Sequence, residues 1–399
     1  MHIAYVTPEF VTEGCSGGGL ASYLANISRI FAKRGHLVTI ITLSSINDDK
    51  IIWDQNIEVE RVNIASITKV FENGILSKIL ASVRLNNRLS KIHNVRKIDI
   101  VQYSNYESVA LCRKREIPTI IRLSSDGILW RATKYIDFDW NKDYKKFNLL
   151  DLLEYHSDKQ ADCLFAPSNV VADITRQRIN RNVYVIESPF YLKNENFDYS
   201  LYKEKLEGKK YLLAHSSMSC LKGTHIFAQS LEKILERYSD LYVVFCGGDH
   251  GIWYKSGKIV KALDYVMQYA GKYSDRVIYL GTQSREKLYP VICNAFACVQ
   301  PSRIDNMPNT CIEAMALGKV VIGTKGASYE QLIENGKSGL LIERDSVDEL
   351  IDAIDKLLDL SPDKIKLMEN AARKISERFD ESIVYDKMIR LYNEVIHRK

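Results

Sequence analysis

Short runs of apolar and β-branched residues alternate with longer stretches of helical spacing, and this pattern occurs twice along the chain. A stretch with helical spacing, Leu20 to Arg34, separates the first two runs. Strand, helix, strand order predicts parallel sheets that helices cover on both faces. In the first series we expect strands at Ile3 to Thr7, Val38 to Thr42, Ile98 to Tyr103, Thr119 to Leu123, Cys163 to Ala166 and Val183 to Glu187.

The pattern restarts after a polar break at Ser188 to Gly208, which contains Pro189. We therefore expect two Rossmann-like α/β domains, residues 1–190 and 191–380, and a terminal segment 381–399 with an amphipathic helix. A length of 399 residues fits two domains. In the second series we expect strands at Lys210 to Ala214, Tyr242 to Cys246, Arg276 to Leu280, Ala297 to Gln300, Val320 to Gly323 and Gly339 to Ile342.

Composition narrows the classes of function. Apolar residues make up 46%, enough for two cores, and the formal net charge of +5 is too small to indicate a nucleic-acid partner. No apolar run is long enough for a membrane span, and the start of the chain lacks signal-peptide character, so we expect a cytoplasmic protein. The eight cysteines form no CxxC pair, which favours reduced thiols over disulfides or a zinc site.

The segment that follows the strand ending at Gln300 carries the strongest site signal, because parallel sheets bind ligands at the carboxyl ends of strands. A loop containing Asp305 leads to Asn309, a good N-cap, and to helix-forming residues Thr310 to Leu317. A helix N-terminus favours a diphosphate. Glu313, expected on the first helical turn, has the chemistry to bind a ribose diol. The alternative is a capped helix with a solvated acidic first turn.

Two further loops join strands to helices. Lys222 and Gly223 follow the strand at 210, and this lysine is either a charge for a phosphate or an ordinary exposed side chain. A glycine-rich loop that includes Gly18 and Gly19 follows the first strand. Glycine lets a backbone approach phosphate closely, although a flexible turn explains the same residues. The loop lacks the GxGxxG spacing, so it does not indicate NAD.

The segment from Asp305 onward resembles the donor-site signature of the family-4 retaining glycosyltransferases, which have the GT-B fold. In that family two acids flank seven residues before an EAMA-type helix, and an acid in a Gly-rich segment follows. Here these features are Asp305, Glu313 to Ala316, and Gly326 to Glu330. The first acid is usually Glu in the family. The resemblance implies two Rossmann-like domains that face each other across a cleft, with the C-terminal helix crossing back to the N-terminal domain.

The resemblance also implies residue roles. Asp305 and the loop after it would contact the transferred sugar, Glu313 the ribose, and Lys222 the diphosphate. Pro308 shapes the loop but has no N–H to donate. The donor site implied in the C-terminal half comprises Ser216, Ser217, Lys222, Asp305, Asn306, Met307, Pro308, Asn309, Thr310 and Glu313.

This sequence departs from the family pattern at two places. Ser216 or Ser217 stands where the family has a phosphate-binding Arg, and Arg303 is the nearest candidate substitute. Ser124 stands where many members have a His near the transferred sugar. Asp126 is then the only strong base nearby, with an Asp-Gly turn as the alternative role.

The family resemblance implies that Gly18 and Gly19 close over the donor phosphates. From the loops described above we expect catalytic roles for Asp305, Lys222, Asp126 and Ser124.

The expected activity is transfer of a sugar from a UDP- or GDP-linked donor to the hydroxyl of a carbohydrate or lipid-linked acceptor, with retention of configuration. Surface-polysaccharide or glycolipid assembly follows from the resemblance alone. We expect no cofactor and no metal, because no aspartate pair has metal-ligand spacing. A non-catalytic nucleotide-sugar-binding homologue and a GT-B sugar-nucleotide epimerase are the alternatives.

A stretch between Glu72 and Asp99 holds basic residues and no acid. Its helical pattern favours either peripheral contact with an anionic membrane or a solvated helix face. The basic residues are Lys78, Arg84, Arg88, Lys91, Arg96 and Lys97.

Overall fold

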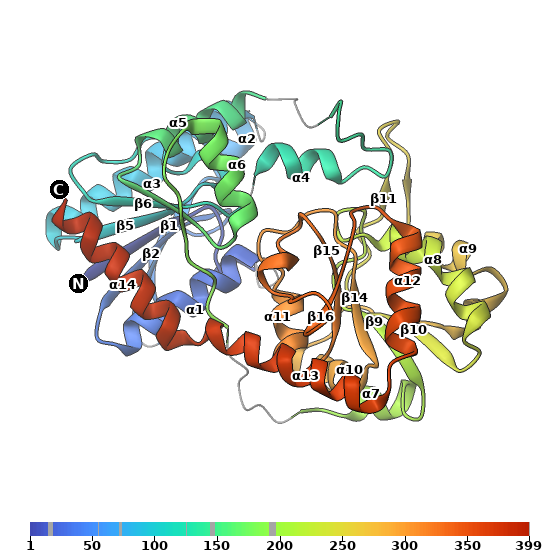
Figure 1. Ribbon diagram of the computed structural model, residues 1–399. Coiled ribbons are helices and arrows are strands. Elements are labelled where there is room, and N and C mark those ends of the chain that lie inside the picture. The colour runs from blue at the N-terminus through green and yellow to red at the C-terminus, as the bar shows by residue number, and fades with distance from the viewer. Residues whose placement is uncertain are drawn as a thin grey trace. The chain divides into compact units, whose positions relative to one another are not determined.

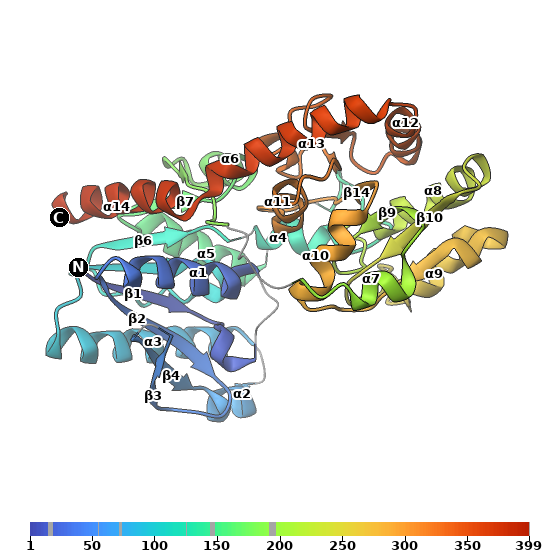
Figure 2. The same cartoon turned by 90° about the horizontal axis from the view of Figure 1, so that it is seen from below.

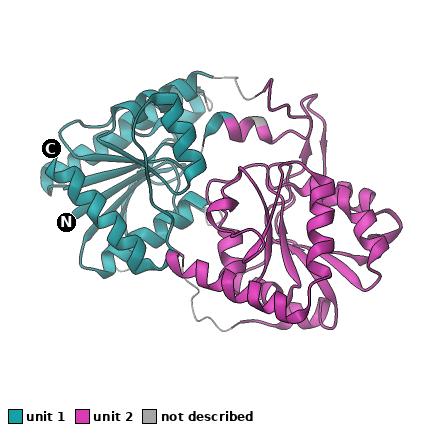
Figure 3. Cartoon of the chain, in the orientation of Figure 1, with its two compact units in different colours: residues 1–128, 146–189, 379–399 teal, residues 129–145, 190–378 magenta. Residues whose placement is uncertain are grey.

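The computed structural model describes residues 1–14, 19–54, 56–71, 74–124, 126–143, 148–190 and 197–398. The chain forms two compact α/β units (Figures 1 and 3). Unit 1 contains residues 1–128, 146–189 and 379–399, and unit 2 contains residues 129–145 and 190–378. Each unit has a parallel sheet with helices on both faces, which confirms the expected Rossmann-like class.

Unit 1 is built on an eight-stranded sheet in the order β3-β4-β2-β1-β5-β6-β7-β8. All neighbouring strands are parallel except the edge pair β3 and β4. The strands are β1 His2–Thr7, β2 Leu37–Ser44, β3 Lys50–Trp53, β4 Ile57–Asn63, β5 Ile100–Ser104, β6 Thr119–Arg122, β7 Cys163–Ala166 and β8 Tyr184–Val185.

Alternate strand residues face opposite sides of this sheet, and each side buries different helices. Ile120 packs with α1 and α14, whereas Ile121 packs with α3 and α6. Figure 2 shows α3 and α14 on opposite sides of the strands. The helices of unit 1 are α1 Gly19–Lys33, α2 Ala65–Phe71, α3 Ile75–Val95, α5 Leu149–Gln160, α6 Asn169–Ile179 and α14 Glu381–His397, and α4 Gly127–Thr133 begins in unit 1 and continues into unit 2.

The C-terminal helix α14 belongs to unit 1, as the fold class implies. Its residues Val384, Met388 and Leu391 are buried against the α1 face of the sheet. Tyr392 donates a hydrogen bond from its hydroxyl to Gln102 Oε1 at 2.6 Å, so a polar contact inside the core fixes the helix on the strands.

Unit 2 has a six-stranded parallel sheet in the order β13-β10-β9-β14-β15-β16. Its strands are β9 Lys210–Ala214, β10 Leu241–Phe245, β13 Val277–Tyr279, β14 Ala297–Gln300, β15 Val321–Thr324 and β16 Gly339–Ile342, with a hairpin of β11 Ile252–Trp253 and β12 Ile259–Val260. Its helices are α7 Ser200–Lys205, α8 Thr224–Arg237, α9 Ala262–Ala270, α10 Arg285–Asn294, α11 Asn309–Ala316, α12 Val347–Leu358 and α13 Pro362–Ser376.

The structure adds elements that the sequence pattern did not indicate. These are the edge strand β3, its neighbour β4 and the hairpin β11–β12. Segment 129–145 joins unit 2 through this hairpin, because Ile136 N–H donates to the Trp253 carbonyl at 2.8 Å. Over the described residues, no helix is long and apolar enough to cross a membrane. Seven cysteines of the described ranges are free thiols.

Candidate functional site

Two loops of unit 2 meet at a glycine and bring Lys222 to Asp305. Gly223 caps α8 with a φ of 71°, and a Cβ at this position would lie 1.8 Å from the Pro301 carbonyl oxygen. Only glycine permits both the left-handed backbone and this close approach. With the loops in contact, Lys222 Nζ forms an ion pair with Asp305 Oδ2 across 83 positions of sequence. Asp305 is 7% exposed and the Lys222 side chain is 23% exposed, so the carboxylate is shielded from water while the ammonium group is half-buried.

The helix α11 begins one residue earlier than expected. Pro308, not Asn309, is the N-cap residue, because its carbonyl oxygen accepts the first helical hydrogen bonds from Cys311 N–H (2.9 Å) and Ile312 N–H (3.2 Å). Asn309 is therefore the first helical residue, and no side chain caps this end. Glu313 consequently lies in the second turn rather than the first. Asn309 and Thr310 are half-buried at the N-terminus.

A histidine that the sequence reasoning missed holds the first turn of α11. His215 directly follows β9, and its Nε2 donates to the Thr310 carbonyl at 3.0 Å. Burial lowers the pKa of His215 to about 4, so the imidazole is neutral near pH 7. Thr310 Oγ1 also donates to Gln300 Oε1 at 3.2 Å. The position of His215 at the carboxyl end of a strand was the available signal.

Glu313 is 6% exposed. Burial raises the pKa of its carboxyl group, and the nearby Arg285 guanidinium opposes that rise. Arg285 Nη2 lies 3.4 Å from Glu313 Oε1, and the Arg285 side chain is 56% exposed. A buried carboxylate that keeps acceptor capacity suits two hydroxyl donors of one ribose. Arg285 is the first residue of α10 and was not singled out from the sequence.

The loop after β15 holds the backbone of Asp305 through a hydrogen bond. Ser328 has a φ of 66° and donates from Oγ to the Asp305 carbonyl at 2.8 Å. The buried hydroxyl groups of Tyr329 and Ser302 lie 3.1 Å apart, within hydrogen-bond distance. Glu330 accepts a hydrogen bond from Gly326 N–H, so the acid of the Gly-rich segment closes its own loop.

Arg303 does not provide the phosphate contact that Ser216 and Ser217 lack. Its guanidinium is buried, pairs with Asp345 at 2.6 Å, and donates to the carbonyls of Tyr135 and Ile136 at 2.5 and 3.1 Å. These bonds attach segment 129–145 to unit 2.

Ser216 and Ser217 are half-buried. The Ser216 carbonyl packs against Gly247, where a Cβ would lie 2.1 Å away. Met307 and Asn306 are each 7% exposed in the loop before α11.

The sequence-predicted residues of unit 1 have structural partners. Asp126 is 6% exposed, accepts a hydrogen bond from the Tyr155 hydroxyl at 3.3 Å, and is ion-paired with Arg178. This pairing weighs against Asp126 as the base for an acceptor hydroxyl. Ser124 Oγ accepts from Arg122 Nη1 at 2.9 Å. Gly19 starts α1, and Gly18 lies outside the described residues.

The basic residues between Glu72 and Asp99, called the basic face below, are partly neutralised by acids on other elements. Lys78 pairs with Glu107 at 2.6 Å, Arg88 with Asp48 and Glu60, and Arg96 with Glu58. These pairs favour a structural role for half of the six basic residues. Among the described residues, no three His, Cys, Asp or Glu side chains are placed to hold a metal ion.

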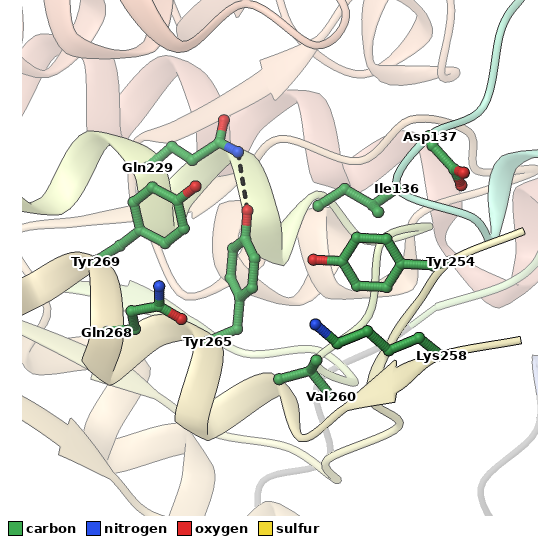
Figure 4. A pocket seen from close by; sticks show the side chains of 9 residues that line it. All are labelled: Ile136, Asp137, Gln229, Tyr254, Lys258, Val260, Tyr265, Gln268 and Tyr269. Atoms are coloured by element: carbon green, nitrogen blue, oxygen red, sulfur yellow. Dashed lines mark hydrogen bonds between the residues drawn. The ribbon is translucent and has the colours of Figure 1, made fainter. Parts of the chain in front are cut away.

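A hollow of about 410 Å³ lies elsewhere in unit 2 (Figure 4). Its lining contains none of the predicted donor residues, so the geometry at α11, not this hollow, defines the candidate donor site. Gln229 Nε2 donates to the Tyr265 hydroxyl at 2.9 Å inside it. The lining residues are Ile136, Asp137, Gln229, Tyr254, Lys258, Val260, Tyr265, Gln268 and Tyr269.

Known proteins resemble this chain in both halves. The D-inositol 3-phosphate glycosyltransferase of Corynebacterium urealyticum is 26% identical over 177 residues, which cover 44% of this chain and 41% of that protein. The chain spans about half the length of the curated relatives it matches.

Two solved structures share the fold. Sucrose-phosphate synthase from Thermosynechococcus elongatus has a TM-score of 0.78 at 15% identity over 100% of both chains. The Anabaena protein HepE in complex with UDP has a TM-score of 0.72 at 16% identity over 99% of this chain and 100% of that one.

Two family descriptions match adjacent parts of the sequence. "Glycosyltransferase Family 4" matches residues 17–190, and "Glycosyl transferases group 1" matches residues 201–375. The chain belongs to the family-4 glycosyltransferases of the GT-B fold.

Proposed function

We propose that this protein transfers a sugar from a UDP- or GDP-linked donor to the hydroxyl of a carbohydrate or lipid-linked acceptor, with retention of configuration and without a metal. The observation that carries the proposal is the ion pair between the half-buried Lys222 and the buried Asp305 beside the N-terminus of α11. The donor site would lie within unit 2.

The chemistry of the residues fits the two ends of such a donor. Free N–H groups at Asn309 and Thr310, together with the Lys222 ammonium, would stabilise charge that develops on the leaving phosphate. Glu313, one turn further along α11, would accept hydrogen bonds from the ribose hydroxyls. Asp305 would contact the transferred sugar while it holds Lys222 in place. The UDP complex of the Anabaena relative supports UDP as the first nucleotide to test.

A non-catalytic nucleotide-sugar-binding protein is the second candidate. Ser216 and Ser217 replace the family's phosphate-binding Arg, and Arg303 is engaged by Asp345 and segment 129–145. Such a protein would bind UDP without turnover.

A donor panel tests both candidates. UDP- and GDP-sugars are incubated with the protein and mixed acceptors, and the released nucleotide is measured with and without EDTA. Lys222→Gln and Asp305→Asn serve as variants of the proposed machinery. Donor-dependent release that both variants lose supports transfer, and NMR of the product anomeric proton tests retention. Tight UDP binding with no release from any donor would leave the non-catalytic candidate.

Peripheral membrane contact is a separate proposal that rests on the basic face. Sedimentation with liposomes tests it. Equal recovery with neutral and anionic vesicles would remove it, and the ion pairs of Lys78, Arg88 and Arg96 already reduce the charge available.

A further inference from the structure

Arg122, the last residue of β6, is a buried cation whose described surroundings contain no carboxylate. It is 5% exposed, and its guanidinium lies 3.9 Å from the ring centre of Tyr23. Nη1 donates to Ser124 Oγ at 2.9 Å and Nη2 to Ser188 Oγ at 3.1 Å, both neutral oxygens. Nε has no hydrogen-bond partner among the described residues.

This environment is unusual for a buried arginine. Buried charges are normally paired, since removing an ion from water without a counter-ion is costly. Arg303 of unit 2 shows the normal arrangement, because it is as buried as Arg122 yet pairs with Asp345 at 2.6 Å. Arg122 has only hydroxyl groups and an aromatic face.

A second orphan polar atom lies on the neighbouring strand. Ser104 ends β5 and is the register partner of Arg122 in β6. Ser104 Oγ is also buried without a partner among the described residues. Both side chains face the α1 side of the sheet, since Ile100 and Ile120, an even number of positions earlier, pack there.

The ends of these strands lie beside the start of a long helix. Tyr23, which stacks on the Arg122 guanidinium, is in the second turn of α1, a helix of 15 residues that begins at Gly19. The N-terminal end of a helix favours negative charge. A buried cation, an orphan hydroxyl and a helix N-terminus are therefore grouped at one edge of unit 1.

We propose that Arg122 and Ser104 bind an oxyanion, a phosphate or carboxylate, that the acceptor carries. The assignment to the acceptor rests on the proposed function, in which Lys222, α11 and Glu313 of unit 2 bind the nucleotide. Arg122 Nε and Ser104 Oγ would donate to the anion, while Ser124 and Ser188 hold the guanidinium in position. An arginine fork suits either oxyanion, because both present paired oxygens.

Ligand-observed NMR on the full chain tests the site without requiring turnover. The probes are D-glucose 6-phosphate, D-glucuronate and D-glucose, which separate phosphate, carboxylate and neutral ligands. We expect at least one anionic probe to bind about tenfold more tightly than glucose. Arg122→Gln should abolish that preference, Arg122→Lys should retain part of it, and Ser104→Ala should weaken it about threefold.

Two controls separate binding from folding. Arg181→Gln removes another unit 1 arginine, one that donates to the backbone carbonyls of Asp158 and Ala161, and should leave anion binding unchanged. Arg122→Gln removes a buried charge that has no acidic partner, which offsets the loss of its contacts with Ser124, Ser188 and Tyr23, so the thermal midpoint should change little and UDP binding should persist.

Equal binding of all three probes to the wild type, or unchanged anion preference in Arg122→Gln, would overturn the proposal. A large fall in the thermal midpoint of Arg122→Gln would show a structural arginine instead. Failure of the proposed transferase function would give a different set of results from failure of the anion site. UDP binding and nucleotide release would then be absent in the wild type while the anion preference persisted, and only the assignment to an acceptor would fail.

Discussion

Gly223 offers a quantitative test of how the donor loops are held together. Its φ of 71° places it in the left-handed region, where an alanine costs about 1 kcal/mol. An added Cβ would also lie 1.8 Å from the Pro301 carbonyl oxygen and 2.4 Å from the carbonyl carbon. Both atoms belong to backbone, so no flexible side chain can move aside.

The size of the effect follows from this geometry. To reach an ordinary contact of 3.4 Å, the loop after β14 must move by about 1.6 Å. Overpacking of this kind typically costs about 1–3 kcal/mol, so Gly223→Ala should destabilise unit 2 by about 3 kcal/mol in total. The same movement separates Lys222 from Asp305, so UDP affinity should fall by about tenfold or more.

Gly208→Ala is the matched control. Gly208 has a φ of 77° and nothing within 4 Å of the Cβ position, so it shares the backbone strain without the clash. Urea denaturation should show a loss of about 1 kcal/mol for this variant. UDP affinity, measured by isothermal titration calorimetry, should not change. If the two alanine variants lose equal stability and both bind UDP like the wild type, the contact between the loops is not what positions the lysine.

Three further predictions concern titratable side chains of unit 2. Burial raises the pKa of Glu313 above its unfolded value, so the cost of its ionised carboxylate to stability begins as pH rises above the unfolded pKa and is complete above the folded pKa; over this rise in pH Glu313→Gln should gain stability relative to the wild type, by about 1.4 kcal/mol per unit of pKa shift, yet bind UDP about tenfold more weakly. Denaturation curves and calorimetry check both, and equal UDP affinity would refute the ribose contact. The pKa of His215 is lowered from 6.5 to about 4, so its contribution is complete above pH 6.5 and is lost as pH falls toward 4, by about 3 kcal/mol; His215→Asn should flatten this pH dependence of the urea midpoint, and an unchanged slope would contradict it. Lys222→Gln and Asp305→Asn should each reduce kcat/KM by about 100-fold but the double variant by little more, because the two act as one unit; additive losses in steady-state kinetics would argue against this.

Much of the fold was accessible from the sequence because buried parallel strands are compact apolar runs. The observed bounds of β7, β9, β14 and β16 equal those expected, and α14 lies within the expected terminal segment 381–399. The edge strand β3 was missed, since it has a half-exposed pattern that resembles a loop. Its neighbour β4, where charged residues interrupt the apolar run, was missed as well. Segment 129–145 belongs to unit 2 through Arg303 and the β11–β12 hairpin, contacts that no local pattern encodes.

In the candidate site, too, local features were predictable from the sequence and contacts between distant residues were not. Spacing indicated a helix after Asp305 but placed its N-cap at Asn309, because N-cap preference favours Asn, whereas the Pro308 carbonyl makes the first helical bonds and Asn309 is the first helical residue. The residues of the Lys222–Asp305 pair are far apart in sequence and meet because Gly223 packs on Pro301. No local sequence pattern predicts this contact. His215 has no motif, and its role emerges from its bond to the Thr310 carbonyl.

The membership of α14 in unit 1 has a consequence for biosynthesis. Residues 379–399 complete a core whose strands come from the first half of the chain, so this core stays unfinished until these residues have been synthesised. All of unit 2 emerges from the ribosome earlier and is free to fold first, which reverses the usual order in which N-terminal domains mature first. Meanwhile the apolar surface that Val384, Met388 and Leu391 later cover is open to chaperones. A premature stop shortly before residue 381 would therefore damage unit 1, although the lost codons lie downstream of all those for unit 2.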